Sequence, residues 1–238
     1  MQNYNFFFFF RRIIHNLYNP ILIVVIFKFK ALGVSKYFSN FAMIFPRADK
    51  ERANSYEKDH FQAKMKEINY KDLKFNPFSL IGDEWMLVTA GNMQKGCNTM
   101  TASWGGLGCL WGHNNPVATI YIRPSRYTKE LIDRENGFTL NVMDKSFKKQ
   151  MAYLGNVSGR DEDKIGKTGL TPIYEEGAPY FAEAKLVLIC RKMYAQPFDE
   201  HGFFYEETIE QNYPLRDFHT MYIGEIEKVL ARDDEYLE

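Results

Sequence analysis

The chain has 238 residues, which suits one domain of ordinary size or one domain with an extension. It holds 30 lysines and arginines against 30 aspartates and glutamates, and this zero net charge gives no sign of a nucleic-acid partner. The three cysteines, Cys97, Cys109 and Cys190, form neither a disulfide framework nor a CxxC motif. They therefore predict no metal site and favour a reducing, cytoplasmic location.

Residues 1–64 differ from the rest of the chain in charge and composition. They hold ten lysines and arginines against four acidic residues, whereas residues 65–238 hold 20 against 26. The apolar run Ile21–Phe27 is shorter than the roughly 20 residues of a membrane helix but suits a signal-peptide core, although its cleavage pattern is poor. The composition is also typical of a translated AT-rich upstream region, the interpretation we favour. We thus expect an extension of doubtful structure, with a natural start near Met65.

From Met65 onward, the apolar residues follow the short period of a β-rich protein. The predicted strands are Glu84–Ala90, 97–104, Val117–Ile122, Phe138–Val142, Leu186–Tyr194 and His219–Ile226. We predict a turn or entry segment at Asn76–Phe78, and Gly105, Gly106 and Gly108 as the break after the second strand. Continuous apolarity predicts that the strand containing Cys190 is buried on both faces.

Helices are expected at three places among these strands. They are Tyr127–Glu135, a helix that Ser146 opens and Gly155 closes, and an insertion between Gln196 and Pro214. Thr128 or Ser125 is the expected N-cap of the first, and the charges of residues 158–169 are expected to form a solvated face. Many short strands with few helices predict a mainly β fold, a barrel with helical insertions.

The sequence lacks the motifs of several enzyme classes. No GxGxxG follows a strand, and GxxxxGK[ST], GxSxG and HExxH do not occur. His113 and His219 are isolated, and we predict that both are hydrogen-bonded structural groups. No catalytic residue is predicted, so a cofactor has to supply any reactivity.

Two stretches carry groups suited to a flat ligand and to a phosphate. In Cys97–Trp104, small side chains let the backbone approach a flat ligand, while amides and hydroxyls supply directional hydrogen bonds. In Arg123–Thr128, two guanidinium groups and two hydroxyls precede a predicted helix, which suits a bound phosphate. Taken singly, the first stretch is also typical of a half-buried strand and the second of a solvated turn.

Together, these stretches resemble a known family. Asn98–Gly105 is similar to the flavin-contacting segment of the flavin reductase-like, FMN-binding split-barrel proteins, the group that includes flavoredoxin. Arg123–Thr128 resembles the phosphate-side segment of that family. A third stretch, Ser158–Asp161 followed by Lys164 and Gly169–Pro172, matches at the expected distance.

The resemblance runs from about Met65 to about Arg232 and implies a fold, a cofactor and a site. The fold is a Greek-key, FMN-binding split β-barrel over residues 65–238, and the family's shared site implies a homodimer. The implied cofactor-binding residues are Asn98, Thr99, Met100, Thr101, Ala102, Ser103, Trp104, Arg123, Ser125, Arg126, Tyr127 and Thr128. Asn141 and Ser158–Gly159 are weaker candidates.

We therefore predict an FMN-binding oxidoreductase, an NAD(P)H-linked flavin reductase that uses NADH or NADPH. Hydride transfer needs no acid or base, which agrees with the lack of a catalytic dyad. The alternatives are a non-enzymatic electron carrier of the flavoredoxin type, and a flavin-binding or oligonucleotide-binding barrel without turnover. The acidic balance of residues 65–238 argues against nucleic acid, and no membrane association is expected for them.

Overall fold

The structure is a computed structural model, and it describes residues 65–174, 178–232 and Tyr236. The predicted extension, residues 1–64, lies outside the described residues, so the domain boundary stays a prediction. The elements, in chain order, are β1 (Lys66–Ile68), η2 (Tyr70–Asp72), η3 (Ser79–Glu84), β2 (Met86–Asn92), β3 (Gly96–Ala102), β4 (Gly105–Cys109), β5 (Pro116–Ile122), α4 (Tyr127–Arg134), β6 (Gly137–Met143), η4 (Lys145–Phe147), α5 (Lys148–Asn156), α6 (Lys164–Thr168), β7 (Pro172–Ile173), β8 (Tyr180–Phe181), β9 (Ala184–Pro197), η5 (Glu200–Gly202), α7 (Glu206–Asn212) and β10 (Thr220–Ala231).

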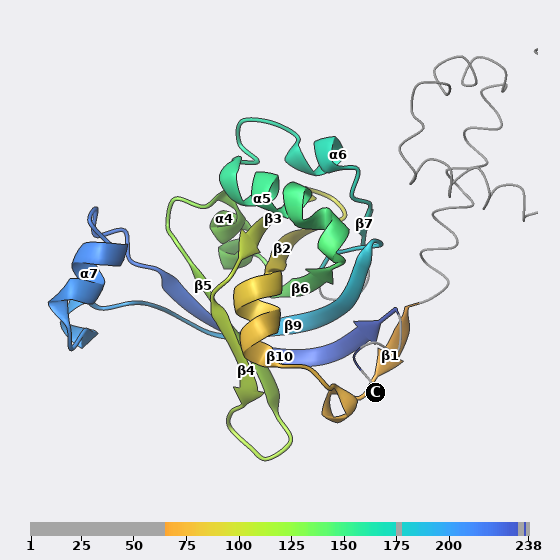
Figure 1. The fold of residues 1–238 in the computed structure, drawn as a ribbon, viewed down its shortest axis with the longest axis horizontal. Helices are drawn as coiled ribbons and strands as arrows, with labels where there is room; N and C mark the ends of the chain where they lie inside the picture. Colours follow the sequence, from red (N-terminus) through yellow and green to blue (C-terminus); the bar gives the residue numbers. More distant parts are fainter. Residues whose placement is uncertain (1–64, 175–177, 233–235, 237–238) are drawn as a thin grey trace, which may run out of the picture. The chain divides into compact units, whose positions relative to one another are not determined.

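One antiparallel sheet of eight strands organises the domain (Figure 1). Its order is β3-β2-β6-β9-β10-β5-β4, and β1 pairs with β10. The two end strands, β3 and β4, are consecutive in the chain and only Ser103 and Trp104 separate them. The sheet is therefore open at the point where the chain passes from one end strand to the other, and the predicted flavin-contacting stretch lies there.

Alternating side chains of the central strands enter two apolar clusters. Val88, Leu140 and Leu188 belong to one cluster, whereas Leu87 and Val187 belong to the other, together with residues of α5 and α6. β9 is buried on both faces from Ala184 to Cys190, as predicted, but its side chains are mostly exposed from Arg191 onward. The cause is that the pairing of β6 with β9 ends at Gly137 and Arg191, so beyond this point β9 is an edge strand that pairs with β10 alone.

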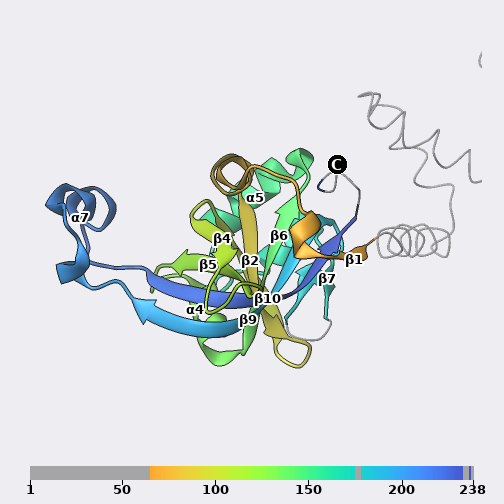
Figure 2. The ribbon, with the colours of Figure 1, turned by 90° about the horizontal axis from the view of Figure 1, so that it is seen from below.

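The helical insertion predicted between Gln196 and Pro214 occupies residues 198–219, which connect β9 to β10 and which we call the arm. The arm contains η5 and α7 and projects away from the sheet (Figure 2). Its base is an aromatic cluster in which Phe203 packs against Phe198, Tyr213 and Phe218, with ring centroids 5.7–6.0 Å apart. These contacts join the two ends of the insertion next to β5.

The predicted entry segment Asn76–Phe78 is confirmed, since the Phe78 N–H donates to Asn76 Oδ1 where a helical segment begins that continues as η3. β2 then begins at Met86, two residues after the predicted start. Two other local predictions are wrong. Gly105, Gly106 and Gly108 lie inside β4 and do not end a strand, because pairing with β5 outweighs the weak strand preference of glycine. Neither Thr128 nor Ser125 caps α4, whose N-cap is Arg126 without a side-chain hydrogen bond.

The strand 138–142 alternates as predicted, but every residue of β6 is buried. Its polar face is covered because the segment before and within β8 lies over it. The Thr139 hydroxyl donates to the Pro179 carbonyl, and the backbone N–H of Phe181 donates to Asn141 Oδ1. No helix in the part of the chain that the structure describes has the length and apolar character needed to cross a membrane.

Candidate functional site

Two pockets lie at the open side of the sheet, and most of the predicted site residues line them. Pocket A, of about 240 Å³, is lined by Met100, Thr101, Ala102, Ser103, Trp104, Tyr121, Arg123, Arg126 and His219. Pocket B, of about 220 Å³, is lined by Asn98, Met100, Ser125, Arg126, Tyr127, Thr128, Leu154, Asn156, Val157, Ser158, Gly159 and Lys164. The two pockets share Met100 and Arg126, so a long ligand can enter both.

Pocket B lies where the start of α4 meets the end of α5. The buried ammonium of Lys164 donates to the carbonyls of Leu154 at 2.8 Å and Val157 at 2.9 Å. Arg126 Nη1 donates to the Gly155 carbonyl at 2.8 Å. Carbonyls at a helix C-terminus attract cations, so the end of α5 holds both positive groups beside one pocket.

These two positive charges have no acidic counterpart in the pocket. Burial and the nearby Arg126 guanidinium lower the pKa of Lys164 to about 8. Within residues 65–174 and 178–232, no carboxylate forms an ion pair with either group and none lines pocket B. Two uncompensated cations in one small pocket favour an anion as its occupant. The expectation of a fully solvated 158–169 segment is thus wrong for Lys164, which is 4% exposed.

A close backbone approach forms another wall of pocket B. A side chain at Gly159 would place its Cβ 2.1 Å from Asn98 Oδ1 and 3.2 Å from Tyr127 Cδ1, so any other residue there would displace the Asn98 side chain. Asn98 Nδ2 in turn donates to Thr128 Oγ1 at 2.8 Å. Arg160 fastens this segment to α4, since it donates to the Ser125 carbonyl and pairs with Glu130.

Pocket A runs along the end of β3. Because β3 is an end strand and pairs only with β2, part of its backbone N–H and C=O groups face away from the sheet. Trp104 is 44% exposed and packs against His219, with ring centroids 4.9 Å apart. The pocket therefore offers free backbone groups on one side and aromatic rings on another.

The last residue of the arm, His219, lines pocket A, and the arm also binds Arg123 of that pocket. Arg123 Nη1 donates to Asp217 Oδ1 at 2.7 Å, and Arg123 Nη2 donates to the Asn212 carbonyl at 2.6 Å. The guanidinium of Arg123 lowers the pKa of Asp217. Arg123 does not line pocket B, so Arg126 is the arginine of this stretch that the structure brings to Lys164.

His219 is a hydrogen-bonded structural group, as predicted. The Tyr213 hydroxyl lies 2.8 Å from His219 Nδ1. Burial and the nearby Arg123 lower the pKa of His219 to about 4, so its ring is neutral near pH 7. His113 shows no such partner among the described contacts and lies exposed in the β4–β5 loop.

Three predicted polar residues direct their side chains into the protein. The Thr99 hydroxyl bonds to Thr89 Oγ1 and to the Val88 carbonyl in the core, and Thr99 lines neither pocket. The Thr101 hydroxyl donates to the Met151 carbonyl. The Asn141 amide is bonded within the buried strands. The hydroxyls of Thr99 and Thr101 are thus already bonded within the protein, and of these three residues Thr101 lines pocket A.

The structure adds pocket residues that the sequence interpretation did not select. They are Tyr121, Leu154, Asn156, Val157, Lys164 and His219. Lys164 occurs in the third resembling stretch, but no local pattern distinguishes it from Lys167. The described residues contain no group of His, Cys, Asp and Glu side chains that could hold a metal ion.

Residues 78–238 match the flavin reductase like domain, which is well over half of the chain. The protein belongs to this family. The predicted resemblance is thereby confirmed. A search of curated proteins gives no match.

Solved structures show the same fold. Flavoredoxin of Desulfovibrio vulgaris (Miyazaki F) is 25% identical, with a TM-score of 0.50 over 65% of this chain and 75% of that chain. Flavoredoxin from Methanosarcina acetivorans is also 25% identical, with a TM-score of 0.51 over 65% and 71%. A putative flavin reductase with a split barrel domain from Shewanella frigidimarina, 22% identical, has a TM-score of 0.50 over 76% and 81%. The predicted mainly β split barrel is confirmed.

Proposed function

We propose that the protein binds FMN and acts as an NAD(P)H-linked flavin reductase. The observation that carries this proposal is the pair of cations in pocket B, Arg126 and Lys164, which have no carboxylate partner among the described residues. Pocket B adjoins the free edge of β3 in pocket A. A phosphate on one end of a ligand and a flat ring on the other match this arrangement.

The residues of pocket B fit a phosphate group. Lys164 and Arg126 supply positive charge, and Ser125 and Ser158 supply hydroxyl donors. The first turn of α4 also offers backbone N–H groups, because no side chain caps that helix. The donor set is thus complete for a dianion before any ligand is present.

The residues of pocket A fit a flat ring system. Met100, Ala102 and Ser103 have backbone groups near the free edge of β3, and Trp104 stands beside them as an aromatic wall. FMN supplies, when bound, the ability to take a hydride from NADH or NADPH and to pass electrons onward. The chain's own task is to hold and orient the ring, and the neutral His219 adds no charge beside it.

Two measurements test the proposal. The visible absorption spectrum of the purified protein should show bound flavin. Stopped-flow absorbance without air should then show rapid bleaching of that flavin by NADH or NADPH. Bleaching by dithionite or a protein donor alone would favour the electron-carrier alternative, and flavin that no donor reduces would favour a binding barrel without turnover.

We also propose that the protein is a homodimer in the cytoplasm. Large apolar side chains, Leu110 and Trp111, are exposed after β4, where a second subunit could cover them. The free thiols Cys97 and Cys109 agree with a reducing compartment. Sedimentation analysis of the wild type and of Trp111→Ser tests the dimer, because the substitution should shift the equilibrium toward monomer.

A further inference from the structure

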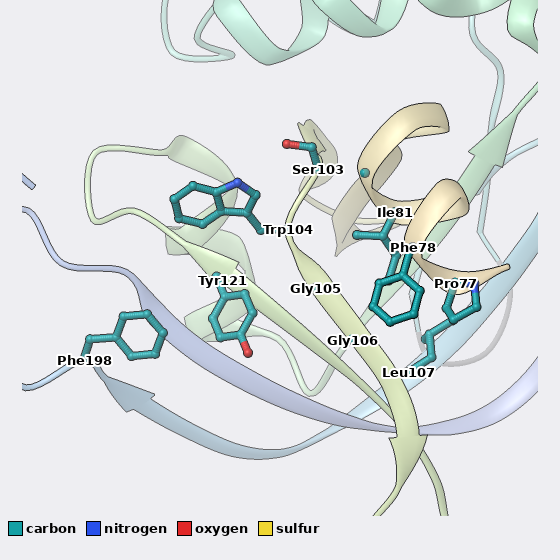
Figure 3. A pocket seen from close by; sticks show the side chains of 11 residues that line it. Pro77, Phe78, Ile81, Ser103, Trp104, Gly105, Gly106, Leu107, Tyr121 and Phe198 are labelled. Atoms are coloured by element: carbon teal, nitrogen blue, oxygen red, sulfur yellow. The ribbon is translucent and has the colours of Figure 1, made fainter. Parts of the chain in front are cut away.

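A larger cavity, which we call the apolar cleft, lies next to pocket A (Figure 3). Its volume is about 520 Å³, within the range of small-molecule sites. Figure 3 shows Phe78 and Ile81 on one side of β4, and Trp104, Tyr121 and Phe198 on the other. The cleft and pocket A have Ser103, Trp104 and Tyr121 in common, so a ligand in the cleft would lie beside the occupant of pocket A.

The lining of the cleft is aromatic and uncharged. Four rings line it, those of Phe78, Trp104, Tyr121 and Phe198, and its lining contains no lysine, arginine, histidine, aspartate or glutamate. Its polar side-chain groups are the hydroxyls of Ser103 and Tyr121 and the indole N–H of Trp104. A charged ligand would lose its hydration here without gaining a counter-ion, whereas an aromatic ring can stack on the side-chain rings.

Glycines leave open space in the lining of the cleft, and Gly106 is the open one that lies on β4. A Cβ at Gly106 would meet no atom within 4 Å, so neither packing nor a positive φ requires glycine at this position. Because Gly106 lines the cleft, a large side chain there would take up part of its open space. Gly108 on the same strand is equally open, but it does not line the cleft.

The rings of the cleft are exposed in the absence of an occupant. Phe78 is 84% exposed, although it begins the helical segment that packs Ile81 into the core. A phenylalanine held out in water has no stabilising role of its own, but a flat apolar ligand would cover it. The exposure of Phe78 therefore agrees with a ligand-binding surface.

We propose that the apolar cleft binds a neutral, planar aromatic compound next to pocket A. Binding does not depend on the proposed function.

Calorimetric titration of the full chain with 2-naphthol, a neutral two-ring probe, tests the proposal. The wild type should bind 2-naphthol better than the anionic 2-naphthoate. Gly106→Leu should weaken 2-naphthol at least about tenfold by filling the cleft, and Gly108→Leu should stay within about twofold. The proposal would be overturned if Gly106→Leu and Gly108→Leu weakened 2-naphthol equally. It would also be overturned if the wild type bound 2-naphthoate as tightly as 2-naphthol.

A second pair of variants covers the case in which Gly106→Leu fails to fold. Phe78→Ala should weaken 2-naphthol about two- to tenfold because one ring is lost. Phe204→Ala removes a ring that is 97% exposed on the arm and outside the cleft, so it should have no effect. If both alanines behave alike, the ligand does not bind in the cleft.

Two further readouts separate this proposal from others. FMN affinity, measured on the same variants, should not change; loss of FMN binding in the wild type would end the proposed function and leave the 2-naphthol result intact. Displacement of 2-naphthol by FMN would assign the cleft to the flavin itself and overturn the proposal. A change from dimer to monomer in Gly106→Leu would overturn it too, since the cleft would then be a subunit interface.

Discussion

Arg123 and Arg126 lie three residues apart, at the end of β5 and at the start of α4, but they belong to different regions of the molecule. Arg123 is bound by the arm, through the Asp217 carboxylate and the Asn212 carbonyl, and it lies over the Tyr213 ring. Arg126 contacts one carbonyl and shares pocket B with Lys164.

The difference lies in what neutralises each guanidinium. A carboxylate 2.7 Å away already compensates the charge of Arg123, so this residue fixes the arm to the sheet. A carbonyl leaves the net charge of Arg126 available to a ligand. The same residue type is thus structural in one region and suited to ligand binding in the other, and the partners decide which.

The largest effect is expected from Arg126→Ala. A charge-assisted contact contributes ~1.5–3 kcal/mol, so FMN should bind about ten- to hundredfold more weakly. Riboflavin, which lacks the phosphate, should lose little affinity, and Arg123→Ala should leave FMN affinity within about twofold. Fluorescence titrations of both ligands measure this. Equal losses for FMN and riboflavin, or an Arg123→Ala effect as large as that of Arg126→Ala, would remove the contrast between the arginines.

The titration of Lys164 should make FMN binding depend on pH. A bound phosphate favours the ammonium form, so FMN affinity should fall as the pH rises through about 8, the pKa of the free site. Lys164→Met should bind FMN more weakly and lose this pH dependence. Riboflavin serves as the control for ionisation of the flavin ring, and an identical pH profile for riboflavin would contradict the assignment.

The same pKa predicts a change in stability for the flavin-free protein. The folded-state pKa of Lys164 lies below its ordinary value of 10.5, so between these values the unfolded chain binds more protons than the folded one. The free energy of unfolding should therefore increase as the pH rises from about 8 to 10.5, so the folded protein becomes more stable. Denaturant melts of the wild type and Lys164→Met across this range measure it.

A smaller effect is expected at the arm. Asp217→Asn removes a partly buried charge contact of ~1 kcal/mol, which lowers the melting temperature by ~2–4 °C in a chain of this size. Glu200→Gln is the matched control, because the Glu200–Arg216 pair on the arm is much more exposed and should contribute little. Scanning calorimetry measures the melting temperatures of both variants. A drop in FMN affinity for Asp217→Asn would show that the arm and pocket B are coupled.

The smallest effect is expected from removal of residues 1–64. Both regions compared above lie after Met65, and charge and phenylalanine content change at that point. A chain that starts at Met65 should be soluble, hold flavin and melt at the same temperature as the full chain. An insoluble product, or one that does not bind flavin, would show that the extension is part of the fold.

Contiguous patterns predicted most of the elements near the site. Val117–Ile122 and Tyr127–Glu135 have the periods of a strand and a helix within themselves, and both agree with β5 and α4 to within one residue at each end. The break at Gly105 is wrong, because there the local preference of glycine competes with pairing against a distant strand. The family resemblance likewise rests on short ordered stretches, which the sequence alone displays.

By itself, the sequence determined the strand-rich domain, the helix after Arg123 and the stretches that carry the family resemblance. Only the tertiary structure decided which charged groups meet. Lys164 reaches pocket B, and Asp217 reaches Arg123 from 94 residues away. The physical reason is that periodicity is a property of neighbouring residues, whereas a pocket forms between strands and helices whose order in space is not their order in the chain.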